Sequence, residues 1–272
     1  MPELPEVETT RRGISPYIEG QRIKKITIRN YSLRWPIPAT LSEILNQQQI
    51  HKISRRAKYL LFHCDDGTLI LHLGMSGSLR ILESDENVNK HDHVDITVDN
   101  GYLLRYTDPR RFGAILWTSE PISEHALLNH LGPEPLSDDF TAEYFSIKAK
   151  TRKISIKKFI MDGKIVVGVG NIYASEALHL ARINPKILAK DLSTKKYEQL
   201  VLSIKQVLEK AIMAGGTTLK DFKKSDGKPG YFAQQLNVYG RKGQACYHCG
   251  SRILDYKEAQ RATYYCPLCQ AN

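Results

Sequence analysis

The chain has 272 residues and a formal net charge of +10, with 42% hydrophobic and 25% charged residues. This composition is that of an ordinary globular protein with one or two domains, and it excludes collagen-like and disordered chains. No run of about 18 apolar residues occurs, so we expect no membrane span. The first twenty residues are acidic and lack an apolar block, which argues against a signal peptide.

The positive charge is concentrated in the C-terminal part of the chain. Residues 1–150 hold 18 Lys and Arg against 20 Asp and Glu, whereas residues 151–272 hold 21 against 9. Such an excess indicates a polyanion as partner, although a solubilising basic surface would give the same count.

The N-terminal half is predicted to be one helix followed by short strands. Helical spacing runs from Glu6 to Ile18 and ends at Gly20. Alternating runs follow, with Asp66-Gly67 and Asn100-Gly101 between them as hairpin turns. The runs cover residues 22–28, 59–63, 69–73, 94–98 and 102–106. This spacing predicts an antiparallel β-sandwich or barrel.

Helices are predicted to dominate the second half. Residues 132–139, which begin Gly-Pro-Glu-Pro, have the composition of a linker. Residues 200–213 repeat apolar side chains at helical spacing, and Gly215-Gly216 ends that helix. Residues 217–232 are rich in Lys, Gly, Asp and Ser, which is typical of a long functional loop.

Four of the five cysteines are close together at the C-terminal end. They form two Cys-x2-Cys pairs separated by sixteen residues: Cys246, Cys249, Cys266 and Cys269. Each pair can present two thiolates to one tetrahedral ion, so the spacing predicts a structural zinc hairpin, with two disulfides as the alternative. Cys64 stands alone in an apolar run and is expected to be a buried thiol.

The N-terminal hexapeptide, Met-Pro-Glu-Leu-Pro-Glu, can carry chemistry. A small second residue favours removal of Met1, which would expose Pro2 as a secondary amine with an appreciable free-base fraction near neutral pH. Such an amine can attack an acetal-like carbon and form an iminium ion, and Glu3 and Glu6 could move protons beside it. The same residues are equally typical of a helix start with acidic side chains in its first turn.

Other segments combine cations with aromatic or flexible side chains. Residues 55–59 suit phosphate contact or a solvated strand edge, and residues 72–77 and 108–113 place Met75 and Phe112 beside arginines. Exposed on loops, Met75 and Phe112 could wedge into a base stack, although both are more usual as core residues.

Two further motifs give weaker signals. Residues 90–95 contain two histidines and two aspartates, but the spacing does not support a metal site, so His91 is expected to donate to phosphate or to lie on a strand. Residues 166–173 contain glycines before a predicted helix and could hold a phosphate, with Asn171 as an added donor. The third glycine of a dinucleotide site is absent, so we expect no nucleotide cofactor.

Together these segments resemble the bacterial formamidopyrimidine-DNA glycosylases, the 8-oxoguanine repair enzymes also called MutM. The matching motifs follow the family's order over essentially the whole chain. They are PELPEVE, RRAKYL, HLGMSGSLR, KHDHVD, YTDPRRFG, LGPEPL, VGVGNIYASE, GGTTLKDF, SDGKPGYF, VYGRKG and QRATYYCPLCQ.

The resemblance implies an enzyme that removes oxidised purines and then cuts the strand by β- and δ-elimination. Pro2 would attack C1′ of the damaged nucleoside, and Glu3 would donate the proton that assists ring opening. Lys58 would serve β-elimination, and Arg261 would serve δ-elimination. The implied DNA contacts are His91, Arg110, Arg111, Arg152 and Asn171, and Met75, Arg110 and Phe112 would fill the gap left by the extruded base.

The resemblance also implies an α+β fold with two domains. We expect an N-terminal antiparallel β-sandwich with a flanking helix, and a helical helix-two-turn-helix domain that ends in a zinc-finger β-hairpin. The expected bounds are 1–132 for the first domain, 133–150 for a linker, 151–236 for the helical domain with a lesion-recognition loop at 217–231, and 237–271 for the four-cysteine zinc finger. One structural Zn²⁺, damaged double-stranded DNA as partner, a monomer and a cytoplasmic, nucleoid-associated location complete the expectation.

The sequence departs from common family usage at two positions. Gly163 stands where relatives often carry Gln or Asn, and Lys158 stands where many have Pro, which bears on the geometry of the following glycine turn. Two other functions fit parts of the sequence: an endonuclease VIII-like glycosylase for oxidised pyrimidines, and a non-enzymatic zinc-ribbon DNA-binding protein. The purine enzyme is favoured over the first by Leu4 together with Met75, Arg110 and Phe112. Pro2-Glu3, Lys58 and Arg261 argue against the second.

Overall fold

The computed structural model describes residues 2–83, 87–216 and 236–271. They fall into two compact units, the first made of residues 2–129 with 214–216, and the second of residues 130–213 with 236–271. The predicted lesion-recognition loop at 217–231 lies outside the described residues. None of the helices in the described part of the chain has the length and apolar character that a membrane crossing needs.

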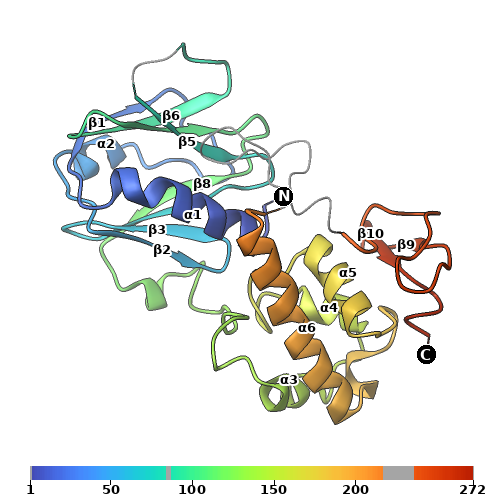
Figure 1. The fold of residues 1–272 in the computed structure, drawn as a ribbon. Coiled ribbons are helices and arrows are strands. Elements are labelled where there is room, and N and C mark those ends of the chain that lie inside the picture. The colour runs from blue at the N-terminus through green and yellow to red at the C-terminus, as the bar shows by residue number, and fades with distance from the viewer. Residues whose placement is uncertain (1, 84–86, 217–235, 272) are drawn as a thin grey trace. The chain divides into compact units, whose positions relative to one another are not determined.

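The first unit is a sandwich of two four-stranded antiparallel sheets (Figure 1). One sheet has the order β1-β6-β7-β5 and the other β2-β3-β4-β8. The strands are β1 (Ile23–Ile28), β2 (Lys52–Arg56), β3 (Tyr59–His63), β4 (Thr68–His72), β5 (Ser78–Leu82), β6 (Asp92–Val98), β7 (Leu103–Thr107) and β8 (Ala114–Thr118). The predicted sandwich is therefore confirmed, and the barrel alternative is wrong.

Helix α1 (Leu4–Ile18) flanks the sandwich and contributes to its core. It contacts β2 and β3 of one sheet and β5 of the other. Its buried face carries Val7, Ile14 and Ile18, which pack in one cluster with apolar residues of both sheets. The short helix α2 (Leu41–Leu45) packs against β1. Because α1 is anchored along its whole length, the residues at its start are held against the sandwich.

The second unit is helical and contains α3 (Ala142–Ala149), α4 (Ile156–Ile160), α5 (Asn171–Leu180) and α6 (Thr194–Met213). Helix α6 places apolar residues at helical spacing against α3 and α5, as its sequence predicts. Phe140, Phe145, Phe159 and Tyr197 form an aromatic cluster in this core. Short 3-10 turns lie at Ile122–Glu124 in the first unit and at Ala189–Asp191 in the second.

A two-stranded hairpin of β9 (Leu254–Glu258) and β10 (Arg261–Tyr265) belongs to the second unit. Strand β10 contacts α5, and Val238, Ile253, Cys246 and Cys266 form a small core under the hairpin. The α+β class, with helices followed by a terminal hairpin, agrees with the sequence-based expectation.

Candidate functional site

The residues at the start of α1 are buried. Pro2 is buried, and Glu3 and Glu6 are 3% and 2% exposed. Glu3 is the N-cap of α1 and forms a capping box with Glu6, in which the backbone N–H of Glu3 donates to Glu6 Oε2 at 2.8 Å. The proline, two carboxyl groups and the helix start are therefore brought together in a site shielded from water, where an amine and a proton donor could act on the same substrate.

Glu8 fixes this helix to the neighbouring strand. Its carboxylate accepts from Arg11 and Arg12, each at 2.8 Å, and pairs with Arg55 of β2 at 3.3 Å. Burial alone would raise the pKa of Glu8, but hydrogen bonds from Arg11 and Arg12 and the charge of Arg55 lower that pKa to about 2. The carboxylate is therefore ionised at neutral pH and ties the start of the chain to β2.

Lys58 lies in the tight turn between β2 and β3. Ala57, which precedes it, has a positive φ of 54°, and the Arg55 guanidinium donates to the Ala57 carbonyl at 2.9 Å. This hydrogen bond holds a turn that an L-residue adopts reluctantly. The half-buried Lys58 is thereby presented at the end of the β2–β3 hairpin.

His72, at the end of β4, is a neutral imidazole with a defined tautomer. Burial and the charges of Lys58 and Arg34 lower its pKa to about 4. Its Nδ1 accepts from the backbone N–H of Gly74 at 3.0 Å, which places the ring proton on Nε2. The ring also packs against Tyr59 with a centroid distance of 4.8 Å. His72 can therefore donate one hydrogen bond from Nε2 at neutral pH.

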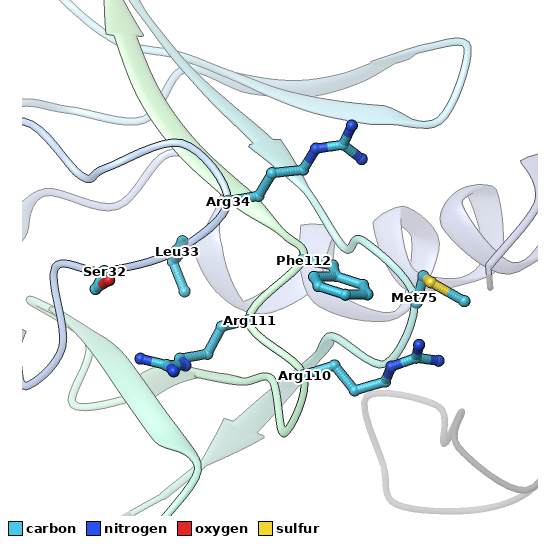
Figure 2. Close-up of a pocket in the computed structure, with 7 residues that line it drawn as sticks. All are labelled: Ser32, Leu33, Arg34, Met75, Arg110, Arg111 and Phe112. Atoms are coloured by element: carbon cyan, nitrogen blue, oxygen red, sulfur yellow. The ribbon is translucent and has the colours of Figure 1, made fainter.

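Met75 and Phe112 stand on two loops that meet beside a pocket of about 430 Å³. The Arg110 guanidinium lies 5.0 Å from the centroid of the Phe112 ring, and Phe112 is 40% exposed. Figure 2 shows Met75, Arg110 and Phe112 grouped on one side of the pocket, with Arg111 extending the other way. The lining residues are Ser32, Leu33, Arg34, Met75, Arg110, Arg111 and Phe112.

Glycines let these two loops approach each other closely. Gly74 has a φ of +64°, and a Cβ at this position would collide with the backbone of Phe112. A Cβ on Gly113 would collide with the Tyr106 hydroxyl. Met75 and Phe112 are thus carried by two backbones in van der Waals contact, which holds the two apolar side chains at a fixed spacing.

Lys157 of α4 connects three elements of the second unit. It is 1% exposed, and its Nζ donates to Asn171 Oδ1 at 2.6 Å, Thr263 Oγ1 at 2.6 Å and the Ala262 carbonyl at 3.3 Å. Asn171 also donates from Nδ2 to the Ala262 carbonyl at 2.9 Å. The exposed Arg261 directly precedes this anchored stretch of β10, so its backbone is held by α4 and α5.

The four C-terminal cysteines converge on one point. Their Sγ atoms all lie within 4.8 Å of one another, and all four are free thiols. Four thiolates at this spacing match the tetrahedral set that Zn²⁺ prefers in structural sites. Gln270, which is fully buried, accepts from the Cys266 N–H at 2.8 Å and donates to the Ile183 carbonyl at 2.8 Å, so the cluster is joined to the segment that follows α5.

Comparison with known proteins identifies the family. Residues 1–115 match the profile described as the formamidopyrimidine-DNA glycosylase N-terminal domain, and residues 131–223 match its H2TH domain. Residues 243–272 match a zinc finger found in FPG and IleRS. Formamidopyrimidine-DNA glycosylases from Saccharophagus degradans and Escherichia coli are each 57% identical over 270 residues, which cover 99% of this chain and 100% of either relative.

The chain belongs to the formamidopyrimidine-DNA glycosylase family.

Solved structures agree with this assignment. A Lactococcus lactis mutant enzyme in complex with a Fapy-dG containing DNA has a TM-score of 0.93 at 35% identity and covers 100% of both chains. MutM from Thermus thermophilus has a TM-score of 0.89 at 34% identity, covering 100% of this chain and 99% of that one. The fold prediction is thus confirmed for the sandwich, the helical domain and the finger.

The zinc prediction is confirmed as well, because the matched finger and the convergence of four free thiols agree. The disulfide alternative is wrong. The metal would be held by Cys246, Cys249, Cys266 and Cys269, and with no open ligand position its role in this glycosylase is structural.

The structure brings some of the predicted site residues together and leaves others apart. Pro2 and Glu3 lie together at the start of α1, and Met75, Arg110 and Phe112 lie together at the pocket. The half-buried His91 stands before β6 with its ring 6.4 Å from His93, and the exposed Arg152 follows α3 in the other unit. Among the described residues the four cysteines are the group whose ligand atoms lie close enough together to hold a metal ion.

Sequence reasoning missed His72, Arg34 and Lys157 as parts of these sites. His72 stands inside one of the matching motifs, but its tautomer depends on the Gly74 N–H, and its low pKa depends on burial and on nearby cations, which no local pattern reveals. Lys157 is 106 residues from Thr263 in the chain, so its role as an anchor follows only from the fold. Two adjacent lysines in a short helix give no signal that one of them is buried.

Proposed function

We propose that Pro2 is the nucleophile of this enzyme and that Glu3 is its proton donor. As a member of the family, the chain is a DNA glycosylase of base excision repair with AP lyase activity. The observation that carries the proposal is the burial of Pro2, Glu3 and Glu6 at the start of α1, where Glu3 and Glu6 form a capping box. Removal of Met1 would leave Pro2 with a secondary amine at that point.

In the first step the Pro2 nitrogen forms a bond to C1′ of the damaged nucleoside while the bond from C1′ to the base breaks. The base departs with the electron pair of that bond and takes up the proton that the attacking Pro2 amine loses. Glu3 then donates a proton to the ring oxygen as the sugar opens, which leaves an iminium ion between Pro2 and C1′.

The iminium is an electron sink for strand cleavage. Loss of a proton from C2′ expels the 3′ phosphate, and a second elimination expels the 5′ phosphate. We assign the first elimination to Lys58, at the end of the β2–β3 hairpin, and the second to Arg261, on the anchored strand β10. Hydrolysis finally releases the sugar fragment and restores the Pro2 amine.

We assign binding of the DNA backbone to cations and neutral donors on both units: His91, Arg110, Arg111, Arg152 and Asn171. Asn171 keeps one amide proton for phosphate while the other bonds the Ala262 carbonyl. Met75, Arg110 and Phe112 would fill the space left when the damaged base leaves the stack.

The proposed substrates are oxidised purines in duplex DNA, with 8-oxoguanine and formamidopyrimidines as the main lesions. Solved complexes of a Lactococcus lactis relative include one with a Fapy-dG containing DNA and one with an oxidised pyrimidine containing DNA. An endonuclease VIII-like preference for pyrimidines is therefore the second candidate. A monomer without a nucleotide cofactor, acting in the cytoplasm on the nucleoid, completes the proposal.

The proposal is tested by borohydride trapping on a duplex with 8-oxoguanine opposite cytosine. We expect a covalent adduct with protein that lacks Met1, as verified by intact mass, and no adduct with protein that retains Met1. Failure of the processed protein to trap would overturn the assignment of Pro2. A matched panel of oxidised purine and pyrimidine duplexes decides between the two lesion classes, since faster excision of pyrimidines would overturn the proposed purine preference.

A further inference from the structure

Asp108 is a fully buried carboxylate at the junction of the two loops that carry Met75 and Phe112. It follows β7 directly and is 0% exposed. Its Oδ1 accepts from Ser76 Oγ at 2.7 Å and from the Arg110 N–H at 3.3 Å. Its Oδ2 accepts from Tyr106 Oη at 3.0 Å and from the Gly113 N–H at 2.9 Å. One carboxylate thus binds residues on both loops.

The link between the loops runs through neighbours of the apolar side chains. Ser76 directly follows Met75, while Arg110 and Gly113 lie on either side of Phe112 along the chain. The Ser76 hydroxyl donates to Asp108 and also accepts from the Arg110 N–H at 3.2 Å. A hydroxyl and a carboxylate therefore join the two loops in a single hydrogen-bonded group.

The backbone of Asp108 is fixed as firmly as its side chain. Its N–H donates to the His91 carbonyl at 3.0 Å, and its carbonyl accepts from His93 Nε2 at 2.8 Å and from the Arg111 N–H at 3.2 Å. Because His91 and His93 hold the backbone of Asp108, its carboxylate cannot follow a loop that moves. The loops must instead adjust to Asp108.

Both oxygens of Asp108 must act as acceptors for this arrangement to hold. The four side-chain contacts are two hydroxyls and two backbone N–H groups, all of them able to donate. An amide at this position would place an NH₂ group against at least one backbone N–H, where neither group can accept. A buried donor left facing another donor is destabilising, so the loop that carries it is expected to move.

We propose that Asp108 is a positioning residue that sets the spacing of Met75, Arg110 and Phe112, so that they enter the base stack as one preformed wedge. The inference rests on the proposed role of those three residues in filling the gap behind an extruded base. Preformed spacing matters because a displacement of about 1 Å in a positioning element can cost about 100-fold in rate.

The test compares Asp108→Asn with wild type on two duplexes. One carries 8-oxoguanine opposite cytosine, and the other carries a preformed abasic site, which has no base to unstack. We expect single-turnover excision of 8-oxoguanine to fall about 10- to 100-fold, and cleavage of the abasic duplex to fall about twofold or less. Fluorescence of 2-aminopurine beside the lesion should also rise more slowly, because wedge insertion is impaired.

Two control variants separate positioning from general destabilisation. Asp95→Asn removes another buried carboxylate of the same sandwich, whose partners Arg29 and Arg105 stand on neither loop. It should lower the melting temperature, while the ratio of the rate of 8-oxoguanine excision to the rate of abasic-duplex cleavage stays as in wild type. Tyr106→Phe removes one donor to Asp108 but keeps both loop contacts, so its ratio should change by less than about threefold.

A third variant, Phe112→Ala, makes failure of this inference distinguishable from failure of the wedge itself. If Phe112→Ala lowers the ratio and Asp108→Asn does not, Asp108 has no positioning role although the wedge is real. If Phe112→Ala leaves the ratio unchanged, the wedge assignment and this inference both fail. Should Asp108→Asn not fold, Ser76→Ala takes its place, and an unchanged ratio in that variant overturns the inference.

Discussion

Replacing Lys157 with Met should destabilise the second unit and slow δ-elimination. Lys157 is 1% exposed and donates three hydrogen bonds to Asn171, Ala262 and Thr263. Hydrogen bonds that involve a charged group contribute about 1.5–3 kcal/mol each, and those sharing one ammonium group are not additive. Methionine restores the apolar volume of the stem but leaves the acceptors without this donor.

We therefore expect the free energy of unfolding of the second unit to fall by about 3–5 kcal/mol. For a unit of this size that corresponds to a loss of roughly 10–20 °C in melting temperature. Because β10 loses its anchor beside Arg261, δ-elimination should slow more than the formation of the trapped adduct. Thermal unfolding, and gel separation of β- from δ-elimination products, measure the two effects.

Lys158→Met is the matched control, since Lys158 is the next residue of α4 and is exposed. Its substitution should change stability by less than about 0.5 kcal/mol. A Lys157→Met protein that melts within 2–3 °C of wild type, on the order of a 1 kcal/mol change, and gives the same products would refute the reasoning.

Three further predictions concern the metal, pH and salt. Removing zinc with a chelator should release the hairpin and abolish cleavage, while circular dichroism still reports the β-sandwich; undiminished cleavage after verified metal loss would contradict this. Glu8→Gln should lower stability at neutral pH by up to about 3 kcal/mol, because the native pKa of Glu8 is about 2 against 4.5 in the unfolded chain. That contribution is fully present above pH 4.5 and is lost as pH falls toward 2, so wild type and variant should converge in acid melts, and a constant difference would argue against it. Arg152→Ala should reduce the slope of log affinity against log salt by about 1 without changing the preference for oxidised DNA, as titrations at several salt concentrations would reveal.

Local patterns predicted much of the fold. The helix at Glu6–Ile18 is confirmed, but α1 begins at Leu4, because the Glu3–Glu6 capping box and a proline in the first turn extend it. Asp66-Gly67 and Asn100-Gly101 do lie between consecutive strands. Strands β2, β5 and β8 were not predicted, since their side chains do not alternate clearly and their pairing is decided by distant partners.

The candidate site was less accessible to local reasoning. Cysteine spacing alone predicted the metal cluster, because ligands from two turns must meet at one ion. The assignment of Pro2, Lys58 and Arg261 came from the resemblance and stays a prediction. The bonds made by Asp108 join segments 32 residues apart, so they could be found only once the fold had brought those segments together.

The close backbone approach at Gly74 and Gly113 has a consequence for how such an enzyme can diverge. Met75 and Phe112 face the pocket, so their side chains can be exchanged with little rebuilding of the loops. The two glycines cannot accept even a methyl group without moving the backbone of a neighbouring loop or the Tyr106 ring. Adaptation to a new lesion or opposing base should therefore proceed by substitution of Met75 and Phe112, while Gly74 and Gly113 are retained. For the same reason, Met75 and Phe112 are the natural positions for laboratory redesign of base preference.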